Sequence, residues 1–568
     1  MFNEKPYIKE IALDGNLKDR NIRAKGRLRF SLICLFFSFF LIALKVTYLS
    51  ALYTKSISSE NKNYVKKSIN NNQRADIVDR NGVLLATSLP WDDLGAHPKK
   101  INNKDKLILS QSMSEILTGA SQKEIYNKLT SNKNFVYLKR KISPREYNAI
   151  VKLKEPEIFK LKNYARHYPH KEHAAHILGG VNIDNVGIKG IEKKYNEILQ
   201  DQNFIDQDKQ LQLSIDIRVQ KILDYHLSQT INKHTALGGT GIVLDIKKSE
   251  ILAMTSLPQY NPNEIRKITK DNEFNMATLG VYELGSVFKS LTLAMALDKN
   301  VVTEDTSYDA TKPLQVGKYT IHDYKPQKRH LKISECVLYS SNICFAQVGR
   351  DLGEDNIKEY IKKMKLNYKA EIEIPESGEP LLPTIWRDTN VMTFSYGHGV
   401  AVSPLQFVNA FSSVINGGNF RYSTLIKGKY LDYNSIDKVI SKETSYRLRK
   451  LLREVVKDKK GSGDKAEVPG YSVAGKTGTA IKNESNRYKT NKNITSFVGF
   501  FPSYEPEFLV FIMVDDPQPI KETFNYVTGG WVAAPTVKKI ISDMAPKLGI
   551  QPENQLNENL KKHANLNN

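Results

Sequence analysis

An uncharged apolar run near the N-terminus constrains this chain more than any other feature. Residues 30–44 carry no charged side chain, and residues 46–53 extend the run beyond Lys45. About twenty residues span a bilayer, so the stretch is long enough if the Lys45 ammonium reaches toward an interface. We therefore expect a transmembrane helix over residues 30–53 and a separate fold for the rest of the 568-residue chain.

Basic side chains precede this run and predict its orientation. Residues 18–29 hold six lysines and arginines against the single acidic residue Asp19. Because such segments stay in the cytoplasm, we expect residues 1–29 to be a cytoplasmic tail and everything after residue 53 to lie across the membrane. A cleavable signal peptide is the alternative, but its apolar part would be shorter, and no clear small-x-small cleavage site follows the run.

The formal net charge of +22 does not identify a partner by itself. The basic residues are spread along the chain and no recognised nucleic-acid motif is present, so we expect no nucleic-acid partner. Attraction to an anionic lipid or cell-wall polymer, or simply a lysine-rich composition, explains the charge equally well.

The three cysteines are too few for a disulfide framework. Cys336 and Cys344 are eight residues apart, about two helical turns, and could share a helix face without being bonded. We therefore expect no structural disulfide.

Local signals beyond the apolar run predict both strands and helices. Asn81-Gly82 between β-type residues is a hairpin signal, and Asp79 and Arg80 are expected to form a turn and a buried pair. Ser403-Pro404 combines a capping box with proline at the first helical position, so a helix begins there. The other expected elements are strands at 211–216, 240–245, 250–254, 496–500 and 508–514 and a helix at 286–298.

These elements predict a multidomain α+β chain. After the transmembrane helix we expect a first domain over residues 54–235, which opens with a polar stalk. A larger second domain over residues 236–548 follows, with strands at both ends and helices between them. Residues 549–568 are polar and are expected to be a disordered tail.

Ser286 and Lys289 are the first candidates for chemistry. A serine hydroxyl is a weak nucleophile until a base takes its proton, and a lysine three residues later on a helix faces the same way. The spacing is weak evidence alone, because three other serines also begin Ser-x-x-Lys matches, namely Ser59, Ser435 and Ser462. In isolation Ser286 would be a helix-capping serine.

Two further motifs follow Ser286 in a fixed order and change its interpretation. Ser340-Ser341-Asn342 supplies a second hydroxyl and an amide, 54 residues after Ser286. Lys476-Thr477-Gly478-Thr479 supplies a second cation beside a glycine, another 136 residues on. Ser-x-Asn also occurs by chance, as at Ser68, but the ordered triple is the signature of class A β-lactamases and penicillin-binding proteins.

With these motifs the chain resembles the class B penicillin-binding proteins, most closely the FtsI type that serves cell division. The resemblance runs from about residue 74 to about residue 540, with two departures: Ala75 and Leu284 replace a glycine and a proline usual in the family. The matching segments are 74–82, 166–169, 174–179, 190–192, 257–262, 396–399, 474–480, 514–517 and 529–535. The last two favour the division type over the elongation type.

The resemblance implies an elongated pedestal (dimerisation) domain over residues 54–235. A penicillin-binding, β-lactamase-like transpeptidase domain over residues 236–548 would follow, with an antiparallel sheet flanked by helices and an all-helical subdomain. It implies a peptidoglycan D,D-transpeptidase at the division septum, on the extracytoplasmic side of the bacterial inner membrane. Implied partners are stem peptides, β-lactams, a glycan polymerase of the FtsW type and other division proteins, with no metal and no cofactor.

The resemblance also gives each catalytic residue a role. Ser286 attacks the penultimate carbonyl of a stem peptide ending in D-Ala-D-Ala, and neutral Lys289 is the base. Lys476 and the helix N-terminus lower the pKa of Lys289 by charge repulsion, aided by burial. Ser340 relays a proton to the leaving amine, while Asn342 holds the substrate amide and orients Lys289.

Three residues of the last motif are expected to bind the substrate. The backbone amides of Ser286 and Thr479 form the oxyanion hole by resemblance. The hydroxyls of Thr477 and Thr479, with Lys476 behind them, bind the terminal carboxylate. Gly478 permits the strand to approach closely.

Several alternatives stay open at this point. An elongation-type transpeptidase, a β-lactamase or penicillin sensor, and an inactive scaffold of the division machinery share much of the pattern. Four histidines between His167 and His176 recur every third residue, but Pro169 interrupts any helix there, so we expect no zinc site. His398, between two glycines, either lines a cleft or serves a turn.

Overall fold

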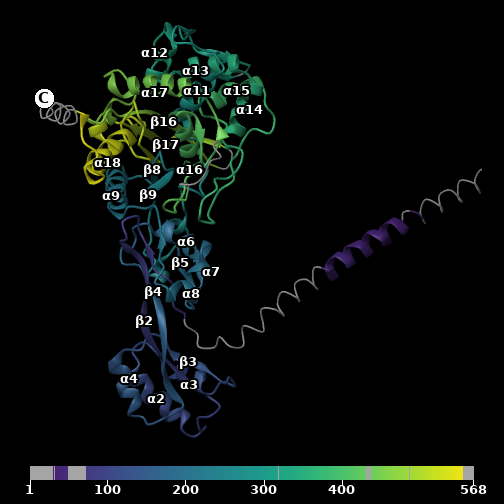
Figure 1. Ribbon diagram of the computed structural model, residues 1–568, viewed down its shortest axis with the longest axis vertical. Coiled ribbons are helices and arrows are strands. Elements are labelled where there is room, and N and C mark those ends of the chain that lie inside the picture. The colour runs from purple at the N-terminus through teal and green to yellow at the C-terminus, as the bar shows by residue number, and fades with distance from the viewer. Residues whose placement is uncertain are drawn as a thin grey trace, which may run out of the picture. The chain divides into compact units, whose positions relative to one another are not determined.

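The computed structural model describes residues 30, 32–48, 72–317, 319–429, 437–484 and 487–553, in two compact units, Met1–Asn71 and Asn72–Asn568. In the first unit residues 32–48 are helical, drawn purple in Figure 1. Among the described residues, no helix combines the length and apolarity that crossing a bilayer requires. Parts of the expected transmembrane helix (residues 31 and 49–53), together with residues 1–29, 54–71 and 554–568, lie outside the described residues.

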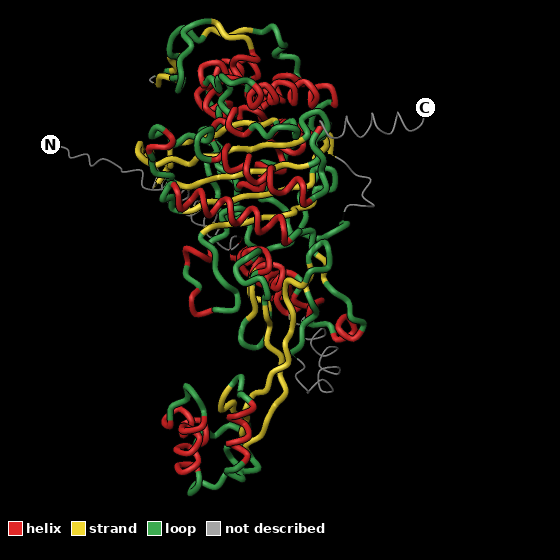
Figure 2. The backbone as a smooth tube through the Cα atoms, turned by 90° about the vertical axis from the view of Figure 1, so that its left-hand side faces the viewer, coloured by secondary structure: helices red, strands yellow, loops and turns green. Residues whose placement is uncertain are grey.

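A five-stranded antiparallel sheet forms the centre of the C-terminal part of the second unit, in the order β16-β17-β18-β8-β9 (Figures 1 and 2). The strands are β8 (Gly238–Asp245), β9 (Glu250–Leu257), β16 (Ala474–Glu484), β17 (Arg487–Phe501) and β18 (Phe508–Asp515). The strands expected at 240–245, 250–254, 496–500 and 508–514 are therefore confirmed. Since β8 and β18 pair directly, the sheet joins the two ends of this domain.

Helices cover both faces of this sheet. Val243 and Ile512 pack in one apolar cluster with residues of α9 and α18, whereas Ile242 and Phe511 pack in another with residues of α11, α16 and α17. Side chains alternate along a strand, so neighbouring residues supply the two cores. The covering helices are α9 (Ile217–Lys233), α11 (Lys289–Asp298), α16 (Pro404–Ile415), α17 (Lys442–Lys457) and α18 (Ala533–Lys547). The capping box of Ser403 and Gln406 starts α16, as expected.

Smaller elements lie between β9 and β16. The helices are α10 (Lys270–Glu273), α12 (Ile333–Leu338), α13 (Asn342–Leu352), α14 (Glu354–Lys363) and α15 (Asp388–Ser395), with short 3-10 turns η1 (Ile265–Lys267) and η2 (Gly285–Phe288). The strands are β10 (Ser307–Asp309), β11 (Leu314–Val316), β12 (Tyr319–Ile321), β13 (His330–Lys332), β14 (Asn419–Phe420) and β15 (Asp437–Lys438). The 3-10 turns η3 (Asp464–Ala466) and η4 (Lys521–Thr523) lie before β16 and after β18.

The expectation of unbonded cysteines is wrong. Cys336 on α12 and Cys344 on α13 form a disulfide, with their Cα atoms 5.9 Å apart. The two residues do not share one continuous helix, because the chain turns at residues 339–341 and folds α13 back toward α12. The disulfide therefore spans the Ser340-Ser341-Asn342 segment.

The N-terminal part of the second unit is built on a long ribbon of β2 (Leu84–Ala96) and β4 (Ile158–His167), visible in Figures 1 and 2. A lobe of α2 (Lys106–Ile116), α3 (Gln122–Leu129), α4 (Pro144–Val151) and β3 (Val136–Lys139) packs around its own apolar cluster. The remaining elements are β1 (Ile77–Val78), α5 (Ala175–Leu178), β5 (Gly180–Val181), β6 (Gly187–Lys189), α6 (Gly190–Lys194), α7 (Asn196–Leu199), α8 (Gln202–Asp206) and β7 (Leu211–Gln212).

The expected turn at Asn81-Gly82 joins β1 to β2, but the expected pair of Asp79 and Arg80 is wrong. The Asp79 carboxylate accepts hydrogen bonds from the backbone N–H groups of Asn81 and Val83. Arg80 instead lies 3.2 Å from the carboxylate of Glu250. Neighbouring side chains at the end of a strand point to opposite sides, which separates the two groups.

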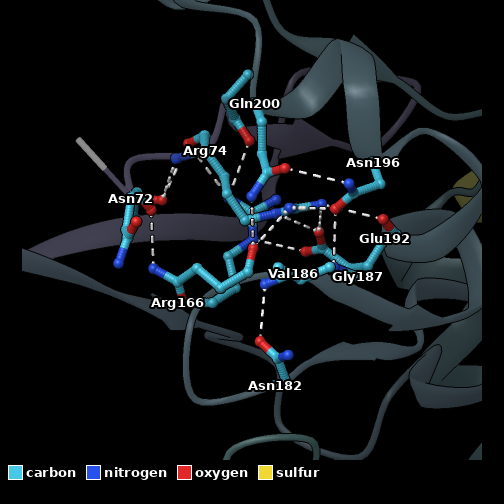
Figure 3. A network of polar contacts seen from close by, with 12 residues as sticks. Asn72, Arg74, Arg166, Asn182, Val186, Gly187, Glu192, Asn196 and Gln200 are labelled. Atoms are coloured by element: carbon cyan, nitrogen blue, oxygen red, sulfur yellow. Dashed lines mark hydrogen bonds and ion pairs between the residues drawn. The ribbon is translucent and has the colours of Figure 1, made fainter. Parts of the chain in front are cut away.

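A buried polar network fastens the pedestal segments together (Figure 3). The Glu192 carboxylate lies 2.7 Å from Arg74 and 2.6 Å from Arg166, and all three side chains are fully buried. Arg74 also donates to the Asn185 carbonyl and to the Asn196 side chain, each at 2.8 Å. One carboxylate thus holds two guanidinium groups, one from the segment before β1 and one from β4.

We predict that Glu192→Gln destabilises the protein strongly. The substitution leaves two buried guanidinium groups without their shared anion, and breaking such a buried pair costs about 3–5 kcal/mol. The midpoint of urea unfolding measures the loss. Glu197→Gln, at an exposed carboxylate on α7, is the matched control and is expected to leave the midpoint in place; equal midpoints for the two variants would contradict the prediction.

Candidate active site

Ser286 lies in a 3-10 turn rather than in the α-helix expected over residues 286–298. The turn η2 covers Gly285–Phe288, and α11 begins at Lys289. A 3-10 turn has three residues per turn, so Ser286 and Lys289 project from the same side. Although the turn is not the expected α-helix, Ser286 and Lys289 still face the same side, as the sequence predicted.

Close contacts between backbones fix the position of this turn. Gly285 has a φ of +61° and lies directly against the carbonyl of Thr479, where a Cβ atom would come within 2.5 Å of the oxygen. Gly397 in turn packs against the carbonyl of Gly285, which leaves no space for a side chain. A Cβ at Gly478 would meet the Leu284 carbonyl at 2.5 Å. The backbone of the turn that carries Ser286 thus packs directly against the backbone of β16, and only glycine fits at these contacts.

Two lysines converge on the hydroxyl of Ser340. The Lys476 ammonium donates to the Ser340 Oγ at 2.7 Å, and the Lys289 Nζ lies 3.3 Å from the same oxygen. Lys289 also donates to the Ser340 carbonyl at 2.6 Å and to the Asn342 Oδ1 at 2.7 Å. These four residues, expected from the sequence to act together, lie in direct contact.

Burial and repulsion lower the pKa of both lysines. Burial, followed by the charge of Lys476, holds the pKa of Lys289 well below its usual range, with Asp323 acting in the opposite direction. Burial lowers the pKa of Lys476 to about 7. A neutral Lys289 amine has two hydrogens, which the Ser340 carbonyl and Asn342 accept, so its lone pair is left for a proton. Each lysine has three oxygens within hydrogen-bonding distance, since Lys289 also lies near the Ser340 Oγ. The assignment of the neutral amine to Lys289 therefore rests on its pKa, which burial and the charge of Lys476 both lower.

The turn at residues 340–342 is held in a strained conformation. Ser340 has a φ of +58°, in the left-handed region that non-glycine residues rarely adopt. The Asp323 carboxylate accepts from the Ser341 hydroxyl at 2.7 Å and from the Ile343 N–H at 3.0 Å. The Ser341 hydroxyl also caps α13 by accepting from the Cys344 N–H. Sequence reasoning missed Asp323, which follows no motif and meets the turn only through the fold.

The strand β16 forms the opposite part of the site. The Thr477 hydroxyl donates to the Ser462 Oγ at 3.1 Å, and the Thr479 Oγ1 accepts from the Gly529 N–H at 3.1 Å. Ser462 was one of the three other Ser-x-x-Lys matches. The structure places it beside Thr477, in the Lys476–Thr479 motif.

These elements border one cleft of about 630 Å³. Its lining includes five of the expected site residues, Ser286, Ser340, Asn342, Thr477 and Thr479. In the described part of the chain the Ser286 hydroxyl makes no hydrogen bond. Catalytic hydrogen bonds are often long before substrate binds, so the cleft-lining hydroxyl of Ser286 and the buried amine of Lys289 fit a nucleophile and its base.

His398 lines the cleft, which answers one question that the sequence left open. Burial, followed by the charge of Lys289, lowers its pKa to about 4. The Nδ1 atom of His398 is buried and has no hydrogen-bond partner among the described residues. The imidazole is therefore neutral at the edge of the site.

The histidines of the 167–176 segment bind protein groups instead of one another. His173 contacts the Asp224 carboxylate at 2.6 Å, and His176 contacts the Asn272 carbonyl at 2.9 Å. Within the described residues, no three metal-binding side chains gather in one place.

Comparisons with known proteins match both parts of the second unit. Residues 69–214 match the family model of the penicillin-binding protein dimerisation domain, and residues 239–542 match that of the penicillin-binding protein transpeptidase domain.

Curated relatives cover most of the chain. It is 34% identical to the probable peptidoglycan D,D-transpeptidase FtsI of Caulobacter vibrioides, over 85% of this chain and 82% of that protein. It is 29% identical to the peptidoglycan D,D-transpeptidase FtsI of Buchnera aphidicola, over 95% and 98%. It is 30% identical to the stage V sporulation protein D of Bacillus subtilis, over 94% and 88%.

Proposed function

The chain belongs to the penicillin-binding proteins that join a dimerisation domain to a transpeptidase domain, and we propose that it is a serine-type peptidoglycan D,D-transpeptidase of cell division. The observation that carries this proposal is the contact of Lys289, Ser340, Asn342 and Lys476 in a site whose cleft is also lined by Ser286. Relatives named as FtsI transpeptidases support the septal role.

The reaction begins with acylation of Ser286. Lys289 takes the hydroxyl proton while Oγ attacks the penultimate carbonyl of a stem peptide ending in D-Ala-D-Ala. The N–H groups of Ser286 and Thr479 stabilise the oxyanion, a role that the packing of Gly285 against Thr479 supports. Ser340 relays the proton from Lys289 to the leaving amine as the amide C–N bond breaks, so the last D-alanine departs and the peptide stays on Ser286 as an ester.

The same groups act in the second half of the reaction, with the directions of proton transfer reversed. An amine of a neighbouring stem peptide attacks the ester, loses its proton and releases Ser286. The hydroxyls of Thr477 and Thr479 bind the terminal carboxylate of the donor, and the ammonium of Lys476 behind them, which contacts the Thr477 hydroxyl, supplies positive charge. β-Lactams resemble the donor and acylate the same serine.

The setting of the enzyme follows from its N-terminal segment. We propose that residues 30–53 anchor the chain in the bacterial inner membrane, with the basic residues 18–29 in the cytoplasm and the catalytic domain outside. A glycan polymerase of the FtsW type supplies the strands that this enzyme cross-links.

Ser286→Ala is expected to abolish covalent labelling by a fluorescent penicillin while the unfolding midpoint stays in place. The substitution removes the only atom that can form the acyl bond in this proposal. Gel fluorescence after denaturation measures the label, and Ser542→Ala on α18 is the matched control, with labelling unchanged. Persistent label on the wild type supports a transferase, whereas rapid release of the drug supports a β-lactamase and absence of label an inactive scaffold.

In the pH profile of the acylation rate, Lys476→Gln is expected to shift the rise on the acidic side to higher pH, by about one unit. Only neutral Lys289 accepts the proton, so the rate rises as the pH passes its pKa. Loss of the Lys476 charge removes a cause that depresses this pKa, so the pKa of Lys289 rises. The rate of penicillin acylation at a series of pH values measures the midpoint of this rise.

Lys482→Gln is the control for that experiment. It removes a charge from the same strand, where Lys482 pairs with Asp515 at 2.8 Å, and is expected to leave the midpoint of this rise in place. A midpoint that stays still or moves to lower pH in Lys476→Gln would contradict the assignment of Lys289 as the base.

Depletion of the protein in its own host is expected to produce filamentous cells. A septal transpeptidase is needed for division and not for growth in length. Microscopy of cell shape during depletion measures the outcome, and rounded cells would assign the enzyme to elongation.

A further inference from the structure

A disulfide encloses the segment that contacts both lysines of the site. Cys336 on α12 and Cys344 on α13 are bonded, eight positions apart along the chain, and both side chains are fully buried. Ser340 and Asn342 lie between them, and each contacts Lys289. The proposed reaction uses this segment but assigns no role to the bond that encloses it.

The chain reverses inside the disulfide loop through a backbone conformation that needs support. Ser340 has a φ of +58°, and a non-glycine residue stays in this left-handed region only where the surrounding structure holds it. The bonded cysteines give part of that support. The Ser341 N–H donates to the Cys336 carbonyl at 3.0 Å, and the Cys344 N–H donates to the Ser341 hydroxyl at 3.1 Å. The loop is therefore closed from both of its ends.

The two helices that border the loop are anchored to different parts of the domain. α12 packs against α17, and its last carbonyl, of Leu338, accepts from the Ser462 N–H at 3.2 Å. α13 packs against α11 and α15, and the Asp323 carboxylate holds its first turn by accepting from the Ile343 N–H. The disulfide joins these two sets of contacts, so it fixes the end of α12 relative to the start of α13.

A small displacement between these helix ends reaches the reacting groups. Ser340 offers its carbonyl to Lys289 at 2.6 Å and its hydroxyl to Lys476 at 2.7 Å. Asn342 offers Lys289 a further acceptor at 2.7 Å. A shift of about 1 Å breaks hydrogen bonds of this length, and misplacement on that scale costs about a hundredfold in rate.

We propose that the disulfide of Cys336 and Cys344 is a positioning element of the active site. It holds the turn at residues 340–342 against the base, and the enzyme reaches its full acylation rate only after the two thiols have been oxidised. This inference rests on the proposed function, because the reaction that the turn serves is the acylation of Ser286.

Formation of the bond belongs to the maturation of the protein. The two thiols lose two protons and two electrons as the S–S bond forms, and a disulfide oxidant takes up both and becomes a dithiol. Disulfides form and persist outside the cytoplasm, where the proposed membrane orientation places the domain. Because both cysteines are buried in the folded domain, the bond forms during folding and resists reducing agents afterwards.

The first measurement counts thiols in the full-length protein. Wild type denatured without reductant is expected to react with one maleimide, at the free Cys34, and with three after reduction, because the chain holds three cysteines. Mass spectrometry measures the added groups. Reaction with three maleimides before reduction would overturn the inference.

The second measurement follows acylation by a fluorescent penicillin in detergent and separates the acylation rate constant from the dissociation constant of the non-covalent complex. In Cys336→Ala/Cys344→Ala the rate constant is expected to fall at least about tenfold, because the turn that carries Ser340 is no longer held. The dissociation constant is expected to change less than about threefold, since the hydroxyls of β16 stay in place. Each single variant is expected to lose as much as the double variant, because either substitution removes the whole bond.

Leu352→Ala, at the buried far end of α13, is the matched control for lost packing. It is expected to lower the unfolding midpoint and to leave the acylation rate constant unchanged. An undiminished rate constant in the double cysteine variant, or single losses that multiply in it, would refute the positioning role. If wild type is not acylated at all, the proposed function fails; if wild type is acylated no faster than the double variant, only the inference about the disulfide fails.

Discussion

Two lysine side chains that share one serine hydroxyl inside the protein are the constraint on which the site depends. Lys289 is 1% exposed and Lys476 is fully buried, so two ammonium groups there would repel each other with little screening from water. The charge of Lys476 adds to burial in lowering the pKa of Lys289, which makes Lys289 the neutral partner. Three elements meet at this point: β16 contributes Lys476, the start of α11 contributes Lys289, and the turn at residues 340–342 contributes Ser340.

Structural features that depend on short segments of the chain were predicted correctly from the sequence. The capping box of Ser403 and Gln406 and the Asn81-Gly82 turn depend on neighbouring residues, so the chain alone determines them. The strands 240–245 and 508–514 followed from composition and alternation. The site residues from Ser286 to Thr479 came from ordered motifs, and the structure brings the four polar side chains Lys289, Ser340, Asn342 and Lys476 into contact as the motifs implied.

Pairs that depend on the path of the chain were missed or misjudged. Cys336 and Cys344 are bonded because the chain reverses between them, and no signal near either cysteine indicates that reversal. Arg80 pairs with Glu250 instead of Asp79, and Asp323 reaches Ser341 from another loop. Ser462 looked like a chance match, but β16 lies beside it. In each case the partner is decided by packing between elements, which local spacing does not encode.

The pairing of β8 with β18 has a consequence for how the protein is made. During synthesis β8 and β9 emerge early, and their hairpin keeps an open edge until the C-terminal strands arrive. A nascent chain that stops before β16 therefore exposes an apolar edge that can pair with other chains. It also lacks Lys476, whose charge lowers the pKa of Lys289, so the contacts of the proposed catalytic set form only when the whole domain has been translated and the sheet has closed.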